Sequence, residues 1–429
     1  MIHIEERKLP QHNIPIVTFF HPKKLYLHLS QHTGRSSKLV VNKGDLLEEA
    51  SLIAERDGLI SASLSSPVKG YFKDIVSFNH PSLKRGLAVV IEREESPNKI
   101  YSFNKKALFL KRDALLDKIQ KAGIVGMGGA AFPTHVKLNP PKEIDTLIVN
   151  GCECEPYLSC DYRLMVEKSE EIFKGVEIIC RIISPKRVLF ALEENKLEAI
   201  KKFNSMISTK RIPLPNPKVI ILSSRYPTGG EKQLIYVLTK RIVPLGGLPF
   251  DVGCLVHNVG TIFAIYEAVY YNKPLVERVV TFAGGALREP KNILLKLGTT
   301  IRELFDGGIL SFKKEPLKII YGGPMMGITL KGLDYPVMKG TTGILFLTKE
   351  EIDIREESVC IRCARCVDNC PMGLLPLEFV KKVKQKEYIY LNDLYIKDCI
   401  ECGVCSFSCP AKIPLVHYIK IGKKYAVNR

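Results

Sequence analysis

Two matching cysteine runs constrain this chain of 429 residues more than any other feature. Residues 360–371 read CIRCARCVDNCP and residues 399–410 read CIECGVCSFSCP. Both runs have the spacing C-x2-C-x2-C-x3-C-P, which is typical of cysteines that bind [4Fe-4S] clusters. Structural zinc sites and disulfides are the alternatives, but zinc sites usually close with two pairs of ligands and not with three plus one. The runs therefore predict two [4Fe-4S] clusters.

The eight thiolates are expected to divide across the two runs. In proteins with two clusters, the fourth cysteine of each run binds the cluster of the other run. We predict that the ligands of one cluster are Cys360, Cys363, Cys366 and Cys409. Those of the other cluster are Cys370, Cys399, Cys402 and Cys405. Two clusters that exchange ligands in this way lie close together and pass electrons one at a time.

Composition limits the remaining classes of function. The 63 basic and 45 acidic residues give a net charge of +18, which invites a nucleic-acid interpretation. The basic residues are spread along the chain without a recognisable nucleic-acid module. We therefore attribute the positive charge to a generally lysine-rich composition, with a membrane surface or an acidic protein partner as the alternative. We expect no nucleic-acid partner. No stretch approaches the about 20 apolar residues that cross a bilayer, and thirteen cysteines without an export signal indicate a reducing compartment.

The order of predicted elements indicates a multidomain chain of α/β and α+β character. Residues 1–100 contain short strands and turns, and the motifs VNKGDLL and SPVKG resemble those of the biotinyl/lipoyl-like barrel-sandwich hybrid. This domain has no attachment lysine at a hairpin tip, so we expect a docking role. Four of its histidines are expected to be ordinary polar residues in loops, namely His21, His28, His32 and His80.

Three further domains follow. Residues 105–275 alternate helical and apolar strand segments, which predicts a Rossmann-like α/β domain. Residues 276–345 are predicted to be a β-grasp (SLBB-like) domain, with a helix over residues 293–305 entered through Thr299 or Thr300 as its cap. Residues 350–429 form the two-cluster, ferredoxin-type domain, with a helix at residues 377–386 between the cysteine runs.

Four polar, glycine-bearing loops of the α/β domain follow strand-like runs, and ligands gather at the carboxyl ends of strands in open α/β sheets. They cover residues 126–137, 151–161, 226–233 and 257–261. The first reads GMGGAAFPTHVK, whose glycines let the backbone approach a phosphate and whose lysine adds a positive charge. An ordinary turn is the alternative, and the spacing is not the dinucleotide fingerprint. Since clusters carry single electrons and small reductants deliver hydrides, we predict a flavin here.

These loops resemble those of the NADH-oxidising, FMN-binding subunit of respiratory complex I. Residues 126–138 resemble its loop GRGGAGFPTGLKW, and residues 150–156 resemble N-A-D-E-x-E-P. Residues 258–261 resemble N-N-V-E-T, and residues 230–231 resemble the start of G-E-E-T. The whole chain is more similar to a sister family, the C subunits of the Rnf/Rsx electron transport complex. The motifs that carry this resemblance are NGCECEPYLSCD, YPTGGEKQL, GGPMMG and the twin cysteine runs.

The resemblance implies a peripheral subunit at the cytoplasmic face of the bacterial inner membrane. Such a subunit would pass electrons from NADH, its substrate, through non-covalent FMN to two [4Fe-4S] clusters. Its complex would couple electron transfer between NADH and ferredoxin, or another low-potential acceptor, to ion translocation. The implied partners are integral membrane subunits and a ferredoxin-like subunit. A ferredoxin-like relay and docking subunit without its own NADH site is the alternative function.

The resemblance also implies the residues of the nucleotide site. Lys137 is expected to hold a flavin phosphate or ring oxygen, and Glu231 the nicotinamide ribose. The full expected set is Gly126, Gly128, Gly129, Phe132, Lys137, Asn150, Glu153, Glu155, Gly230, Glu231, Asn258 and Thr261. The chain departs from the complex I loops at Met127, Ala131, Lys232 and Gly260. Packing, with no metal or cofactor bound, is expected of Cys152, Cys154, Cys160 and the GGPMMG segment at residues 322–327.

Overall fold

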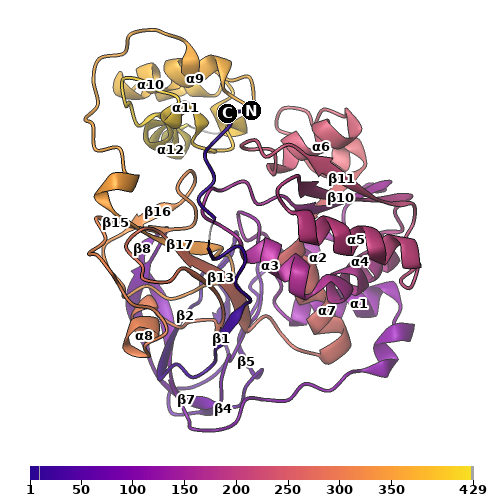
Figure 1. Ribbon diagram of the computed structural model, residues 1–429. Helices are drawn as coiled ribbons and strands as arrows, with labels where there is room; N and C mark the ends of the chain where they lie inside the picture. The colour runs from indigo at the N-terminus through magenta and orange to yellow at the C-terminus, as the bar shows by residue number, and fades with distance from the viewer. Residues whose placement is uncertain (9, 427–429) are drawn as a thin grey trace.

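The structure is a computed structural model that describes residues 1–8 and 10–426. Figure 1 shows the cysteine-rich C-terminal region beside two larger bodies, a mixed body of strands and a layered body of helices and strands. Within the described residues, no helix is both long and apolar enough to span a bilayer.

The N-terminal region contains two small sheets that share one apolar core. The first has the order β2-β8-β7-β4, formed by Lys24–His28, Lys84–Arg93, Gly70–His80 and Leu46–Leu47. The second has the order β3-β5-β6, formed by Lys38–Leu39, Leu52–Glu55 and Leu64–Ser65. Leu25, Ile53 and Val89 are fully buried between them. Buried residues alternate with less buried ones at the start of β2 and of β7, which directs one face of these strands to the core, whereas β8 is buried over four consecutive residues.

Two of the four N-terminal histidines were wrongly expected in loops. His28 ends β2 and His80 ends β7, and their ring centroids lie 4.7 Å apart. The Nε2 atom of His28 lies 2.9 Å from the carbonyl oxygen of Asn79, and that of His80 lies 3.0 Å from the carbonyl oxygen of Ser30. Burial lowers the pKa of His28 to about 4 and also lowers the pKa of His80. The pair is therefore held neutral in the folded protein.

Acidification from pH 7 to 5 should therefore destabilise the N-terminal region. Because the folded pKa of His28 is depressed, the unfolded chain binds more protons between about pH 6.5 and 4, and the free energy of unfolding falls as the pH falls. The loss from His28 alone should be about 2 kcal/mol at pH 5. Hydrogen exchange of β2 and β8 at the two pH values measures it. The loss should shrink in His28→Gln and persist in His21→Gln, whose side chain is exposed; an equal loss in both variants would contradict this explanation.

The α/β region is built on a parallel sheet with the order β11-β10-β9-β12. Its strands are Pro217–Leu222, Arg187–Glu193, Thr146–Gly151 and Cys254–Asn258. Its helices are α1 (Arg112–Lys121), α2 (Thr134–Lys137), α3 (Cys160–Glu167), α4 (Ser169–Ile183), α5 (Leu197–Thr209), α6 (Glu231–Thr239) and α7 (Val259–Tyr271), with 3-10 turns at Lys105–Phe109 and Pro249–Val252. The central strands β9 and β10 are buried along their length, as expected when helices cover both faces of a parallel sheet. Asn150 at the end of β9 pairs in register with Asn258 at the end of β12, which brings two of the predicted loops together.

A six-stranded sheet follows, with the order β1-β14-β13-β17-β15-β16. Its strands are Val17–Phe19, Lys291–Lys296, Glu277–Ala283, Gly343–Leu347, Lys318–Tyr321 and Ile328–Leu330. The predicted helix over residues 293–305 was wrong in its first part, since β14 pairs there with β13 and β1. The helix is only α8 (Ile301–Asp306), and Thr300 caps it as expected by accepting a hydrogen bond from the Glu303 N–H.

The C-terminal region has short helices around the two cysteine runs. They are α9 (Arg365–Asp368), α10 (Pro376–Lys384), α11 (Val404–Phe407) and α12 (Leu415–Tyr425), with 3-10 turns at Lys349–Glu351, Tyr388–Leu391 and Ile396–Asp398. The predicted helix at residues 377–386 is confirmed as α10. Phe379, Leu391 and Ile419 form its small core. The N-terminal segment passes between this region and the α/β region, where Ile2 exchanges two backbone hydrogen bonds with Tyr226.

Candidate functional site

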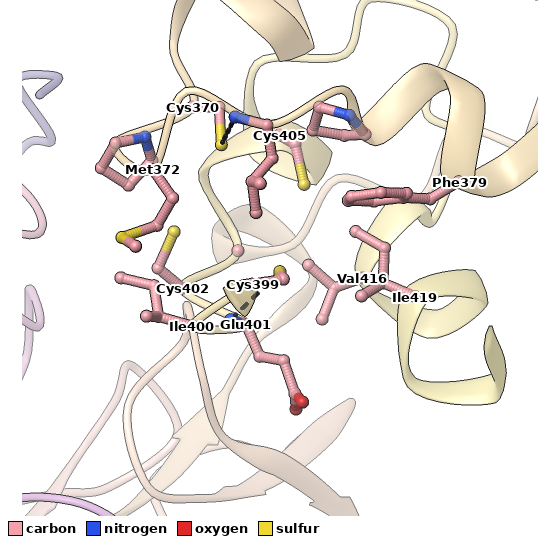
Figure 2. A pocket seen from close by; sticks show the side chains of 14 residues that line it. Cys370, Met372, Phe379, Cys399, Ile400, Glu401, Cys402, Cys405, Val416 and Ile419 are labelled. Atoms are coloured by element: carbon pink, nitrogen blue, oxygen red, sulfur yellow. Dashed lines mark hydrogen bonds between the residues drawn. The ribbon is translucent and has the colours of Figure 1, made fainter. Parts of the chain in front are cut away.

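Four cysteines from both runs line one pocket of about 350 Å³. Figure 2 shows the sulfur atoms of Cys370, Cys399, Cys402 and Cys405 around the same central space. Burial, together with the neighbouring thiols of Cys399, Cys402 and Cys370, raises the pKa of Cys405 to about 12. We call these four residues the inner cluster site. The structure thus brings Cys370 of the first run to three cysteines of the second, which is the grouping that the sequence predicts.

The other four cysteines also form a group, which we call the outer cluster site. The pKa of Cys366 is raised mainly by burial, and next by the thiols of Cys409, Cys360 and Cys363. Cys360 and Cys363 are exposed, whereas Cys402, Cys405 and Cys409 are buried. Among the described residues, no group of three or more His, Cys, Asp and Glu side chains is arranged to hold a single metal ion. The two groups therefore differ in their access to solvent.

The two cysteine runs repeat the same backbone turns. Arg362 and Glu401, each just before the second cysteine of its run, have a φ of 54°. Ala364 and Gly403, each just after it, have φ values of 58° and 83°. The turns direct backbone N–H groups to sulfur, since Arg362 N and Glu401 N each lie 3.4 Å from the first sulfur of their run. Such donors stabilise thiolates and tune a bound cluster.

Residues 126–137 form a closed loop with an exposed tip, which we call the glycine loop. The Gly126 N–H donates to the Phe132 carbonyl oxygen at 2.8 Å and closes the loop. Gly128 and Gly129 are exposed at its tip. A Cβ on Gly128 would lie 3.0 Å from the Cβ of Asn258, so a side chain would crowd the second loop. Thr261 holds the loop from below, because its Oγ1 accepts the Met127 N–H at 2.9 Å.

The two predicted asparagines lie beside this loop with their amides already oriented. Asn258 Oδ1 accepts the Gly260 N–H at 2.9 Å and so caps α7. Its Nδ2 donates to Asp161 Oδ2 at 2.6 Å. Asn150 Nδ2 donates to the carbonyl oxygen of Gly229 at 2.9 Å, which ties β9 to the loop at residues 226–233. Asn150 Oδ1 accepts the Cys152 N–H at 3.0 Å, so the orientation of both amides is fixed from within the protein.

Lys137 and Glu231 are in direct contact. The Lys137 ammonium lies 2.5 Å from Glu231 Oε1, and both side chains are partly exposed. Lys137 ends α2 and Glu231 begins α6, where a carboxylate is favoured by the helix dipole. The sequence placed the two residues on separate loops with separate tasks. The structure joins the glycine loop to residues 226–233 through this ion pair.

Glu153 and Glu155 are held inside the protein. Glu153 accepts the N–H groups of Asp161 and Tyr162 at the start of α3, and its carboxylate lies 3.8 Å from the buried Lys196 ammonium. Glu155 accepts the N–H groups of Met325 and Met326, each at 3.0 Å. Burial raises the pKa of Glu155 to about 7 in spite of these two donors. Both carboxylates therefore accept hydrogen bonds from backbone N–H groups around the site.

The residues around the glycine loop leave hydrogen-bonding capacity for a flavin. Two buried side-chain atoms there, Thr134 Oγ1 and His257 Nε2, have no partner among the described residues. Burial, with the nearby Lys137 ammonium, lowers the pKa of His257 well below its usual value. An exposed glycine tip, a lysine, oriented amides and unused polar atoms fit a phosphate-bearing, hydrogen-bonding cofactor. The thiol groups fit iron–sulfur clusters in the same sense.

Several residues at the site had not been singled out from the sequence. Asp161 orients Asn258, and it ends the motif NGCECEPYLSCD, so the motif carried a signal. Arg278 donates to the Met127 carbonyl oxygen from β13, about 150 residues further along, where no pattern marks it. Both line a small pocket together with Met127. Cys152 and Cys160 are buried, and Cys154 accepts the Gly229 N–H at 3.0 Å.

Three family descriptions match parts of the chain. Residues 2–96 match the RnfC barrel sandwich hybrid domain, residues 119–267 match the Nuo51 FMN-binding domain, and residues 359–413 match the 4Fe-4S dicluster domain. Among solved structures, an NAD+-reducing [NiFe]-hydrogenase in the H2-reduced state is similar with a TM-score of 0.52 and 18% identity. That match covers 75% of this chain and 63% of the hydrogenase chain, and it concerns the fold.

Curated relatives match along most of the chain. The C subunit of the proton-translocating ferredoxin:NAD+ oxidoreductase complex of Clostridium ljungdahlii is 44% identical over 87% of this chain and 82% of its own length. The C subunit of the Na+-translocating complex of Acetobacterium woodii is 37% identical over 99% of this chain and 95% of its own. The C subunit of the ion-translocating oxidoreductase complex of Pectobacterium atrosepticum is 37% identical, and the chain spans 60% of its length.

Proposed function

The chain belongs to the family of C subunits of ion-translocating ferredoxin:NAD+ oxidoreductase complexes, and on this premise we propose that it passes electrons between NADH and iron–sulfur clusters. The complex couples electron transfer between NADH and ferredoxin, or another low-potential acceptor, to ion movement across a membrane. One observation carries the proposal. Within a single polypeptide, contacts lead from the glycine loop, through the Lys137–Glu231 pair, to a pocket lined by four cysteines.

The glycine loop, Asn150, Asn258 and Lys137 are the proposed FMN site. When bound, FMN accepts a hydride from NADH and returns two electrons singly. Lys137 supplies positive charge toward the flavin, and Glu231 accepts hydrogen bonds from the nicotinamide ribose. The ion pair between them keeps the two binding surfaces in register.

Two [4Fe-4S] clusters are proposed, one at the inner and one at the outer cluster site. The inner site lies against the α/β region, since Cys402 packs in one buried apolar group with Tyr226. The outer site has two exposed cysteines, Cys360 and Cys363. With clusters bound, the inner site would be the entry for electrons from NADH and the outer site their exit. A ferredoxin-like subunit of the complex is the proposed acceptor there.

The finer fold names belong to the same proposal. The parallel sheet and its helices form a Rossmann-like flavin domain within residues 105–275. The six-stranded sheet forms a β-grasp module within residues 276–345, to which β1 of the N-terminal region adds an edge strand.

An absorbance measurement tests the proposed function. NADH added to anaerobically purified protein that carries flavin and iron should bleach the flavin band and then lower the cluster absorbance. A relay subunit without its own NADH site is the second candidate, and it predicts that only dithionite reduces the clusters. Absence of flavin bleaching by NADH in flavin-loaded protein would contradict the proposal.

We also expect peripheral attachment at the cytoplasmic face of the membrane, through integral membrane subunits. The net charge of +18 favours contacts that salt weakens. High salt should release the subunit from membranes of cells that produce the whole complex, as a fractionation and immunoblot would show. Retention of the subunit through a high-salt wash would contradict this expectation.

A further inference from the structure

Residues 226–233, which we call the coupling segment, contact both the glycine loop and the inner cluster site. On one side, Glu231 pairs with Lys137. On the other side, three of its side chains contact either an inner cluster cysteine or a residue next to one. Tyr226 is 3% exposed, and its hydroxyl donates to the carbonyl oxygen of Cys402 at 2.7 Å.

The coupling segment makes two further polar contacts to the neighbourhood of the inner cluster site. The Lys232 ammonium lies 3.5 Å from a carboxylate oxygen of Asp398, the residue before Cys399, and both side chains are largely buried. Gln233 Nε2 donates to the carbonyl oxygen of Pro371, the residue after Cys370, at 3.4 Å. The segment thus holds the chain beside three of the four inner cysteines. These contacts also explain why a lysine follows Glu231 here.

The GGPMMG segment also contacts the loop that carries Cys402, and Met325 packs in the same apolar group as Tyr226. Gly403 has a φ of 83°, and a Cβ there would lie 2.4 Å from the Met325 carbonyl oxygen, so only glycine permits this approach. Glu155 holds Met325 and Met326 by their N–H groups. Gly323 lets the Glu155 carboxylate approach, because a Cβ at that position would lie 2.2 Å from its Cδ. The segment is therefore a docking surface for the cluster loop.

We propose that the coupling segment seats the inner cluster against the flavin site, with Tyr226, Lys232 and Gln233 as positioning residues for electron transfer between them. This proposal rests on the proposed function of the chain. One electron moves in each transfer, from the reduced flavin to the oxidised cluster, and no bond forms or breaks at the coupling segment. Since electron transfer slows steeply with distance, a looser seat slows this step without affecting hydride transfer from NADH.

Tyr226→Phe tests the proposal, because it removes one hydroxyl and keeps the buried ring. In protein carrying flavin and clusters, amide hydrogen exchange at residues 399–405 should rise about fivefold, which corresponds to a neutral hydrogen bond of about 1 kcal/mol. In stopped-flow experiments with NADH, flavin reduction should keep its rate while cluster reduction slows. Lys232→Met should act in the same direction. Iron content and the cluster EPR signals should match those of the unmodified protein.

Tyr321→Phe is the control, since the Tyr321 hydroxyl also donates to a buried carbonyl oxygen, that of Pro336, but outside the coupling segment and both cysteine runs. It should change neither the exchange of residues 399–405 nor cluster reduction. The proposal is overturned if exchange at residues 399–405 is unchanged in both Tyr226→Phe and Lys232→Met, or if Tyr321→Phe slows cluster reduction equally. The hydrogen-exchange measurement does not use NADH. If NADH failed to reduce the flavin, the proposed function would fail, but the exchange result would still support or contradict the role of the coupling segment.

Discussion

Cys409→Ala should remove the cluster at the outer site, although Cys409 belongs to the second cysteine run. The electrostatic neighbours of Cys366 are Cys409, Cys360 and Cys363, so the side chain of Cys409 completes the outer group. Without the fourth thiolate, a [4Fe-4S] cluster loses one of its protein ligands. Iron content should fall by about half if one of two clusters is lost. The inner cluster keeps its four cysteines and should remain.

Iron analysis and EPR of the dithionite-reduced protein measure this result. Cys370→Ala should give the converse, with loss of the inner cluster and retention of the outer one, because Cys370 lies with Cys399, Cys402 and Cys405. Cys180→Ala is the control, since Cys180 lies in α4, far from both runs in sequence. If each alanine variant lost the cluster of its own run, the exchange of ligands between runs would be disproved.

Glu231→Gln should retain flavin but weaken NADH-dependent flavin reduction by about 1.5–3 kcal/mol, which is about 10- to 150-fold. The neutral amide loses the charge that favours hydrogen bonds from a ribose and the charge that pairs with Lys137. Lys137→Met should instead lower the flavin content, because the ammonium at the end of α2 is lost. Stopped-flow reduction by NADH and flavin quantification measure the two effects.

The ion pair makes these two effects non-additive. In the double variant, the free-energy loss in NADH-dependent flavin reduction should be smaller than the sum of the losses in the two single variants. Each single change also leaves the other charge unpaired. Lys142 and Asp251 offer the control, since they form a surface pair at 2.6 Å. They precede β9 and β12, at the ends of these strands that lie away from Asn150 and Asn258. Lys142→Met should leave NADH kinetics unchanged. Full flavin content in Lys137→Met, or normal kinetics in Glu231→Gln, would exclude the respective residue from the site.

Most residues of the proposed site could be predicted from the sequence because chemistry at strand ends leaves local patterns. Glycines at 126, 128 and 129, the asparagine at the end of β9 and the asparagine before α7 all stand in or next to elements with clear periodicity. The cysteine spacing carries its own geometry. These features are local, and a window of about ten residues contains each of them.

Other features depend on contacts that no local window contains. The segment at residues 293–297 carries both apolar and polar residues without a decisive period, and pairing with β1 from the N-terminal region favours a strand there. A carboxylate such as Glu155 is visible in the sequence, but its hydrogen-bond donors lie about 170 residues away. Tyr226 contacts Cys402 only because two regions of the chain pack together.

The order of electron transfer is tested most directly by NADH reduction of variants that lack one cluster. Freeze-quench EPR after mixing with NADH shows which remaining cluster accepts electrons. In Cys409→Ala, the inner cluster should still be reduced at the rate of the unmodified protein. In Cys370→Ala, NADH should reduce the flavin, whereas the outer cluster should stay oxidised until dithionite is added. Reduction of the outer cluster by NADH at an undiminished rate in Cys370→Ala would contradict the inner-to-outer route.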